Sequence, residues 1–101
     1  MDEIKISNIV RSLKGRDCGR LFVVVGFPQE NYLSLADGKL RRIESPKLKK
    51  LKHVEFVSDN ETRVGEKLRA GEKVTNAELR RLFSGWEDPS EKINDTMTGG
   101  N

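Results

Sequence analysis

Cysteine and histidine are almost absent from this chain, and their scarcity excludes two kinds of site. Among 101 residues there is one cysteine, Cys18, and one histidine, His53. No disulfide can form within the chain, and a zinc site built from several cysteine and histidine ligands is excluded. A single unpaired thiol fits a reducing compartment, so we expect a cytoplasmic protein. We also expect no metal and no other cofactor.

Long apolar runs are also missing. The first ten residues, MDEIKISNIV, are acidic at once and lack the apolar stretch of a signal peptide. No run approaches the roughly 20 apolar residues that a membrane-spanning helix needs. The segment KLKKLK, residues 47–52, carries only two leucines, too small an apolar face for a membrane-bound helix. We therefore expect no membrane partner.

Positive charge is concentrated in one half of the chain. Residues 1–53 carry twelve Lys/Arg and six Asp/Glu, whereas residues 54–101 carry seven and ten, within a total of +3. Residues 39–52 hold seven of these bases and a single acid, Glu44. Such a cluster repels itself unless a partner neutralises it, so the pattern predicts a polyanionic partner for the first half.

The segment LFVVVGF, residues 21–27, predicts the central strand of a sheet. It is rich in β-branched and aromatic residues and is apolar on both faces. Gly26 indicates a bulge or bend inside this strand, and Pro28 is expected to end it. Shorter strands are predicted at 9–13 and 53–57.

The segment YLSLADGKLRRI, residues 32–43, predicts a β-hairpin. Asp37-Gly38 is a dipeptide typical of a type I′ turn between two strands. A two-residue loop there would place Tyr32 opposite Ile43. The hairpin raises the expected number of short strands to about five, a spacing typical of a small curled barrel or sandwich that hides its edges.

Helical signals follow the strands. Ser58 and Glu61 have the spacing of a capping box, which predicts a helix over 59–70 that ends at Gly71. The sequence therefore predicts helical structure after residue 57, whereas it predicts strands before that point.

A second helix is predicted from a second capping box. Thr75 and Glu78 would begin it, and Gly85 would end it. Four apolar residues on or next to this helix form a patch that a protein partner could contact: Leu79, Leu82, Phe83 and Trp86.

These elements define a mainly β fold with a helical extension. We expect a small barrel of about five strands over 1–57, one or two helices over 58–86, and a flexible polar tail over 87–101. With 35% apolar and 35% charged residues, the core must be small.

Candidate catalytic residues are few. Cys18 and His53 could form a pair, but no third group is marked to orient them. Cys18 is interpreted as a turn residue and His53 as a residue that flanks a strand. Gly15 and Gly19 do not fit a phosphate-binding P-loop, so no catalytic residue is assigned and an enzyme is not expected.

Basic residues are the stronger functional signal. Phosphate recognition needs cationic side chains that converge on one surface. The sequence supplies them in three segments, for which we predict RNA contacts: Lys14, Arg16, Arg20, Lys39, Arg41, Arg42, Lys47, Lys49, Lys50 and Lys52. Tyr32 is a candidate for stacking on an unpaired base, although packing within the barrel is the simpler role for it. Gly15 and Gly19 would allow a tight turn with positive φ.

Two motifs resemble the KOW domain. They are LKGRDCGRLFVVVGF at 13–27 and ADGKLRRIESPKLKKLKHVEF at 36–56, within a match of about 8–57. The chain is most similar to compact bacterial KOW-domain RNA-binding proteins, which are similar to KOW-containing large-subunit ribosomal proteins of archaea and eukaryotes. The resemblance implies an SH3-like barrel that binds ribosomal RNA, or that serves translation or transcription. The alternative is a protein-interaction module that uses an apolar groove.

Overall fold

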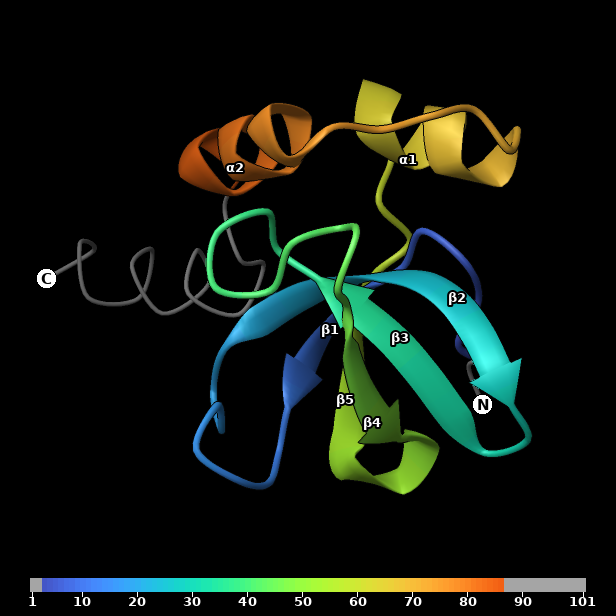
Figure 1. Ribbon diagram of the computed structural model, residues 1–101, viewed down its shortest axis with the longest axis vertical. Helices are drawn as coiled ribbons and strands as arrows, with labels where there is room; N and C mark the ends of the chain where they lie inside the picture. The colour runs from blue at the N-terminus through green and yellow to red at the C-terminus, as the bar shows by residue number, and fades with distance from the viewer. Residues whose placement is uncertain (1–2, 87–101) are drawn as a thin grey trace, which may run out of the picture.

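The computed structural model describes residues 3–86, so the predicted tail lies outside the described residues. Figure 1 shows a bent β-sheet with two helices across one of its faces. The elements, in chain order, are β1 (Ile9–Ser12), β2 (Leu21–Gln29), β3 (Tyr32–Ala36), β4 (Lys47–Lys50), the 3-10 turn η1 (Leu51–His53), β5 (Val54–Ser58), α1 (Arg63–Arg69) and α2 (Asn76–Gly85).

The five strands form one antiparallel sheet in the order β4-β3-β2-β1-β5. The prediction of a central β2 is confirmed, and so is the irregularity at Gly26, where the register with β3 shifts. The expected end at Pro28 is wrong, because β2 continues to Gln29, which pairs with Tyr32. Pro28 is tolerated since it lies where the ladder with β3 is already interrupted.

The predicted hairpin at Asp37-Gly38 is wrong. The tight connection is at Glu30-Asn31, between β2 and β3, and the strand that pairs with β3 on its other side is β4. Tyr32 therefore lies opposite Lys50 and not opposite Ile43. The expected strand over 39–43 does not form.

Local hydrogen bonds explain why a loop replaces this hairpin. The carboxylate of Asp37 accepts hydrogen bonds of 2.9 Å from the backbone N–H groups of Lys39 and Arg41, which closes a compact loop. Gly38 has φ +81°, but Asp37 lacks the positive φ that a type I′ turn also requires. A Cβ atom on Gly38 would also collide with the backbone of Asn76, so α2 packs directly on this loop.

The sheet bends around an inner apolar cluster. Phe22 and Val24 of β2 point into it, together with residues of β1, β3 and β5. The three residues of η1 connect the two edge strands, β4 and β5, which brings the edges together at one corner. Within residues 3–86, however, β4 and β5 do not pair with each other, so the hydrogen-bonded sheet is not closed into a barrel.

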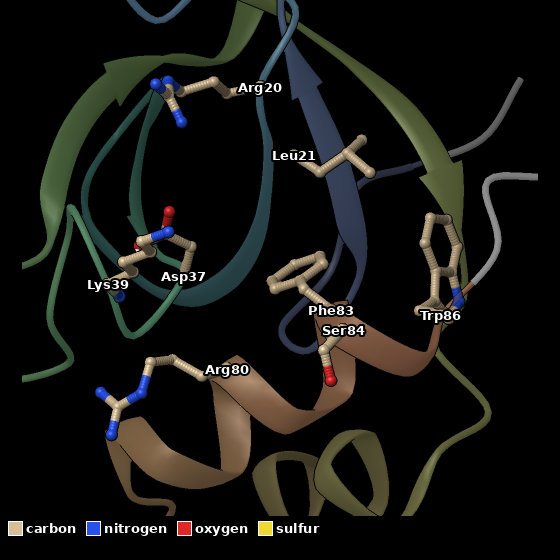
Figure 2. A pocket seen from close by; sticks show the side chains of 8 residues that line it. All are labelled: Arg20, Leu21, Asp37, Lys39, Arg80, Phe83, Ser84 and Trp86. Carbon is tan, nitrogen blue, oxygen red and sulfur yellow. Dashed lines mark hydrogen bonds between the residues drawn. The ribbon is translucent and has the colours of Figure 1, made fainter.

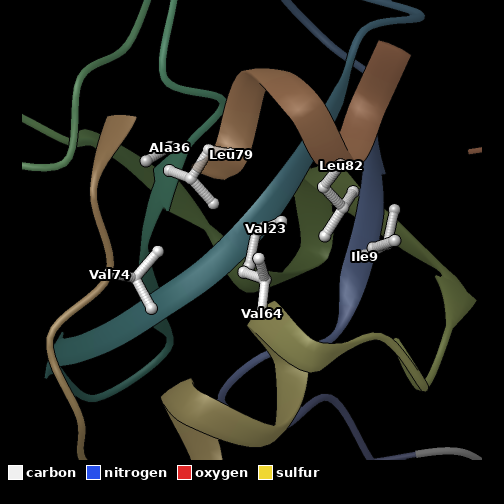
Figure 3. Close-up of a cluster of buried hydrophobic side chains, with 7 residues drawn as sticks. All are labelled: Ile9, Val23, Ala36, Val64, Val74, Leu79 and Leu82. Carbon is white, nitrogen blue, oxygen red and sulfur yellow. The ribbon is translucent and has the colours of Figure 1, made fainter. Parts of the chain in front are cut away.

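The other face of the sheet is covered by the helices. The side chain of Val23 points to the opposite face of the sheet from those of its neighbours in β2. On that face it packs with Val64 of α1 and Leu79 of α2 (Figure 3). Val23 and Leu79 are fully buried. Residues 58–86 therefore share a core with the strands, and β2 is apolar on both faces because each face meets a different layer.

The N-terminal cap of α2 was predicted correctly from the sequence, whereas that of α1 was not. The capping box of α2 is confirmed: Thr75 Oγ1 accepts a hydrogen bond of 3.2 Å from the Glu78 N–H, and Glu78 Oε1 accepts one of 2.8 Å from the Thr75 N–H. The predicted start of α1 at Ser58 is wrong, because Thr62 caps that helix by accepting from Gly65. The chain is still extended at Ser58, which belongs to β5.

Candidate nucleic-acid interface

The turn between β1 and β2 is held by hydrogen bonds and contains two glycines with positive φ. Gly15 and Gly19 have φ of +88° and +91°, so the expectation of positive φ is confirmed. The Gly19 N–H donates to the Ser12 carbonyl oxygen at 2.8 Å, which joins the turn to the end of β1. This turn presents three exposed basic side chains: Lys14, Arg16 and Arg20. Cys18 is also an exposed residue of this turn.

The carboxylate of Asp17 connects the turn to neighbouring strands through hydrogen bonds. Its Oδ1 accepts hydrogen bonds from Lys49 Nζ at 2.9 Å and from Ser12 Oγ at 2.8 Å, and Lys47 Nζ lies 3.7 Å from Oδ2. Burial by itself would raise the pKa of Asp17, but the hydrogen bonds from Lys49 and Ser12 and the charges of both lysines outweigh it and lower the pKa. The carboxylate is therefore ionised at neutral pH.

Three of the predicted RNA contacts are paired with acids. Lys49 is only 7% exposed and also donates to the Lys14 carbonyl oxygen at 2.6 Å, so its ammonium group holds the turn in place. Lys47 shares Asp17 with it. Arg42 lies 3.3 Å from Glu44 on the surface, where an ion pair adds little stability.

A hollow of about 310 Å³ joins the turn to the 37–46 loop. Arg16 and Arg20 line it from the turn, and Arg41 lines it from the loop. Phe22 and Leu40 supply its apolar wall, and Leu40 is 55% exposed. The structure thus brings together two basic segments that are about twenty residues apart in the sequence.

The third basic segment surrounds η1. Lys50 and Lys52 line a second hollow together with Tyr32, Leu51 and Glu30, so Tyr32 shares this hollow with two exposed lysines and one acid. His53 ends η1 and precedes β5, as expected of a residue that flanks a strand.

The pKa of His53 shows how the lysines gather at this corner. Desolvation is the largest cause that lowers the pKa of His53. The charges of four nearby lysines lower this pKa further: Lys14, Lys50, Lys52 and Lys49. His53 is therefore neutral at pH 7. Lys14 belongs to the β1–β2 turn, so the turn lies close to η1 as well as to the 37–46 loop.

Helix α2 contributes a basic residue, Arg80, that was not predicted from the sequence. Arg80 donates a hydrogen bond of 2.7 Å to the Gly38 carbonyl oxygen and lies with Arg20 and Lys39 around a hollow of about 600 Å³ (Figure 2). No local sequence signal marks Arg80, because its neighbours come from two distant segments. Phe83 and Trp86 line the same hollow.

The predicted apolar patch on α2 is split by the fold. Leu79 is fully buried and Leu82 is 8% exposed, since both pack on the sheet. Only Phe83 and Trp86 remain partly exposed.

Neither a comparison with protein-family models nor a search of curated proteins found a match for this chain.

Among residues 3–86, no group of three or more Cys, His, Asp or Glu side chains is placed to bind a metal ion. No helix in this same part of the chain is long and apolar enough to span a membrane.

Proposed function

We propose that this protein is a non-catalytic RNA-binding protein that contacts ribosomal RNA, on the ribosome or during its assembly. One observation carries the proposal: exposed basic side chains from three separate segments gather around the β1–β2 turn. They are Lys14, Arg16, Arg20, Lys39, Arg41, Lys50 and Lys52. Converging cations of this kind supply the sequence-independent part of RNA affinity.

The arrangement of the strands is compatible with the KOW resemblance. The sheet order β4-β3-β2-β1-β5 and the short η1 connection between its edges are compatible with an SH3-like barrel. The inner cluster around Phe22 and Val24 fills the space that such a barrel encloses. The glycine turn and the KLKK segment, two of the motifs behind the resemblance, adjoin each other through Asp17 and Lys49.

The proposed mechanism is recognition by a rigid surface. Asp17 and the backbone hydrogen bonds fix the turn, so its backbone loses little freedom when Arg16 and Arg20 contact phosphates. Tyr32, beside Lys50 and Lys52, offers a ring on which an unpaired base can stack while the lysines contact the backbone.

Salt dependence tests this proposal. If five to seven of the cations neutralise phosphates, log K should fall with log[salt] at a slope of roughly −3.5 to −5 for unpaired RNA. Titrations of labelled ribosomal RNA fragments at several salt concentrations measure the slope. Co-sedimentation with ribosomal particles at low salt, and release at high salt, would extend the result to the particle. A flat dependence contradicts the proposal.

A protein-interaction module is the second candidate. Leu40 is 55% exposed and Leu48, on the edge strand β4, is 51% exposed, so each offers apolar surface to a protein partner. Binding of that kind would change little with salt, which distinguishes it from RNA binding in the same titrations.

A further inference from the structure

The hollow between α2 and the sheet has two chemically different sides. In the view of Figure 2, Lys39 and Arg80 lie toward one side, whereas Phe83 and Trp86 lie toward the other. Arg20 and Leu21 approach from the start of β2. The volume of about 600 Å³ lies within the range of pockets that hold small organic ligands.

The charged side of this hollow favours an anion. Three cationic side chains and one carboxylate, that of Asp37, line the hollow. This carboxylate already accepts two backbone hydrogen bonds within its own loop, from Lys39 and Arg41. Arg80 is held in place by its hydrogen bond to the Gly38 carbonyl oxygen, so its charge is fixed at the rim of the hollow.

The aromatic side of the hollow is accessible. Phe83 and Trp86 pack partly against the core between sheet and helices, yet both remain partly exposed. Partly exposed aromatic rings beside cations are the combination that binds unpaired nucleotides, because the ring stacks on the base and the cation contacts the phosphate.

We propose that this hollow is a binding site for one unpaired nucleotide of the RNA, with its base against Phe83 and Trp86 and its phosphate near Arg20 and Lys39. This inference rests on the proposed RNA-binding function and deepens it. Arg20 lines both this hollow and the one with Arg16 and Arg41, so the site is continuous with the basic surface around the β1–β2 turn. An RNA strand that follows this surface would reach α2 through Arg20.

Trp86 provides a direct readout, because it is the only tryptophan in the chain. A single-stranded RNA hexamer without self-complementarity should quench Trp86 fluorescence, with the same midpoint as the fluorescence anisotropy of a labelled hexamer. A blunt RNA duplex keeps its bases stacked, so it should bind by anisotropy and leave Trp86 fluorescence unchanged. Trp86→Ala should weaken hexamer binding about fivefold or more.

Ser84→Glu tests the site without removing a packed side chain. Ser84 is exposed and lines the hollow, so a carboxylate there would repel the phosphate. Ala77→Glu adds the same charge to an exposed position of α2 that does not line the hollow, and Ser84→Gln adds the bulk without the charge. We expect Ser84→Glu to weaken hexamer binding several-fold more than either control, with all three variants folded by circular dichroism.

Three results would overturn the inference. If the hexamer binds by anisotropy while Trp86 fluorescence is unchanged and Ser84→Glu behaves like Ala77→Glu, the RNA-binding proposal stands and the nucleotide site is wrong. If an acidic peptide such as hexaglutamate quenches Trp86 and the hexamer does not, the hollow is a protein-binding site. If neither RNA binds at low salt, the proposed function fails together with the site.

Discussion

Lys49 Nζ lies 2.9 Å from Asp17 Oδ1, and this contact ties the edge strand β4 to the β1–β2 turn across 32 residues of sequence. Lys49 is 7% exposed and the Asp17 side chain 12%, so both charges are largely removed from water. The cationic side chain that is most buried in the basic surface therefore has a structural role: it fixes the turn from which Arg16 and Arg20 project.

Asp17→Asn should destabilise the protein by about 3 kcal/mol, because it leaves the buried ammonium group of Lys49 without its counter-charge. Urea unfolding followed by circular dichroism measures the loss. Glu55→Gln is the matched control: it removes an acid from a pair with Arg11 that is mostly exposed on the Glu55 side, and should cost less than about 1 kcal/mol. Equal effects of the two substitutions would show that the Asp17 pair is not a structural anchor.

Gly19→Ala should destabilise the protein by about 1 kcal/mol through backbone strain alone. Gly19 has φ +91°, and a Cβ atom there would meet nothing within 4 Å, so no steric collision contributes. Gly85→Ala serves as the control, since this position is helical and equally open and should gain stability. Thermal melting compares the two, and an unchanged melting temperature for Gly19→Ala would refute the strain argument.

Stability should fall as the pH falls from 4.5 toward 2, in part through Glu78. The hydrogen bond from Lys67 at 2.6 Å, followed by that from the Thr75 N–H, lowers the pKa of Glu78 from 4.5 to about 2. Between these values the unfolded chain binds the proton more readily than the folded one, so acid favours unfolding. Urea unfolding at a series of pH values should show a shallower decline for Glu78→Gln; an identical decline would argue against the Lys67–Glu78 link between α1 and α2.

Leu79→Ala should cost about 2–5 kcal/mol, since Leu79 is fully buried between α2 and the sheet. Leu40→Ala, at a site 55% exposed, should change stability by less than about 0.5 kcal/mol.

A chain shortened to end at Ser58 should lose cooperative unfolding, because the outer faces of Ile9 and Val23 would be uncovered. A shortened chain with well-dispersed NMR signals would show that the sheet folds without the helices.

Arg41→Gln should weaken RNA binding and reduce the salt slope by about 0.7 if Arg41 contacts one phosphate. Its place beside Arg16 and Arg20 is the reason for this expectation. Arg63→Gln, at an exposed position at the start of α1 in the helical layer, removes the same charge and should leave the slope unchanged. If both variants lose affinity equally, net charge governs binding and the mapped surface does not.

Local chemistry made several features predictable. The capping box of α2 depends on two residues three positions apart, and its hydrogen bonds form as the sequence indicates. The positive φ at Gly15 and Gly19 likewise follows from a short turn between strands. The central place of β2 could be inferred because a strand that is apolar on both faces must be covered on both.

The errors arose where distant segments compete for the same partner. Asp37-Gly38 has the local sequence of a hairpin, but α2 packs on Gly38, and β3 pairs with β4 instead of with residues 39–43. Three of the four residues of β4 are lysines, a composition that argues against a strand in isolation.

The sequence by itself therefore determined the glycine turn at Gly15 and Gly19, the cap of α2, the central strand and the gathering of positive charge in residues 1–53. Only the tertiary structure decided which cations are exposed and which are paired. It buried Lys49 against Asp17 and brought Arg80 and Trp86 to the side of Arg20. The physical reason is that hydrogen bonds within a few residues are encoded locally, whereas the desolvation and pairing of a charge depend on segments that only folding brings together.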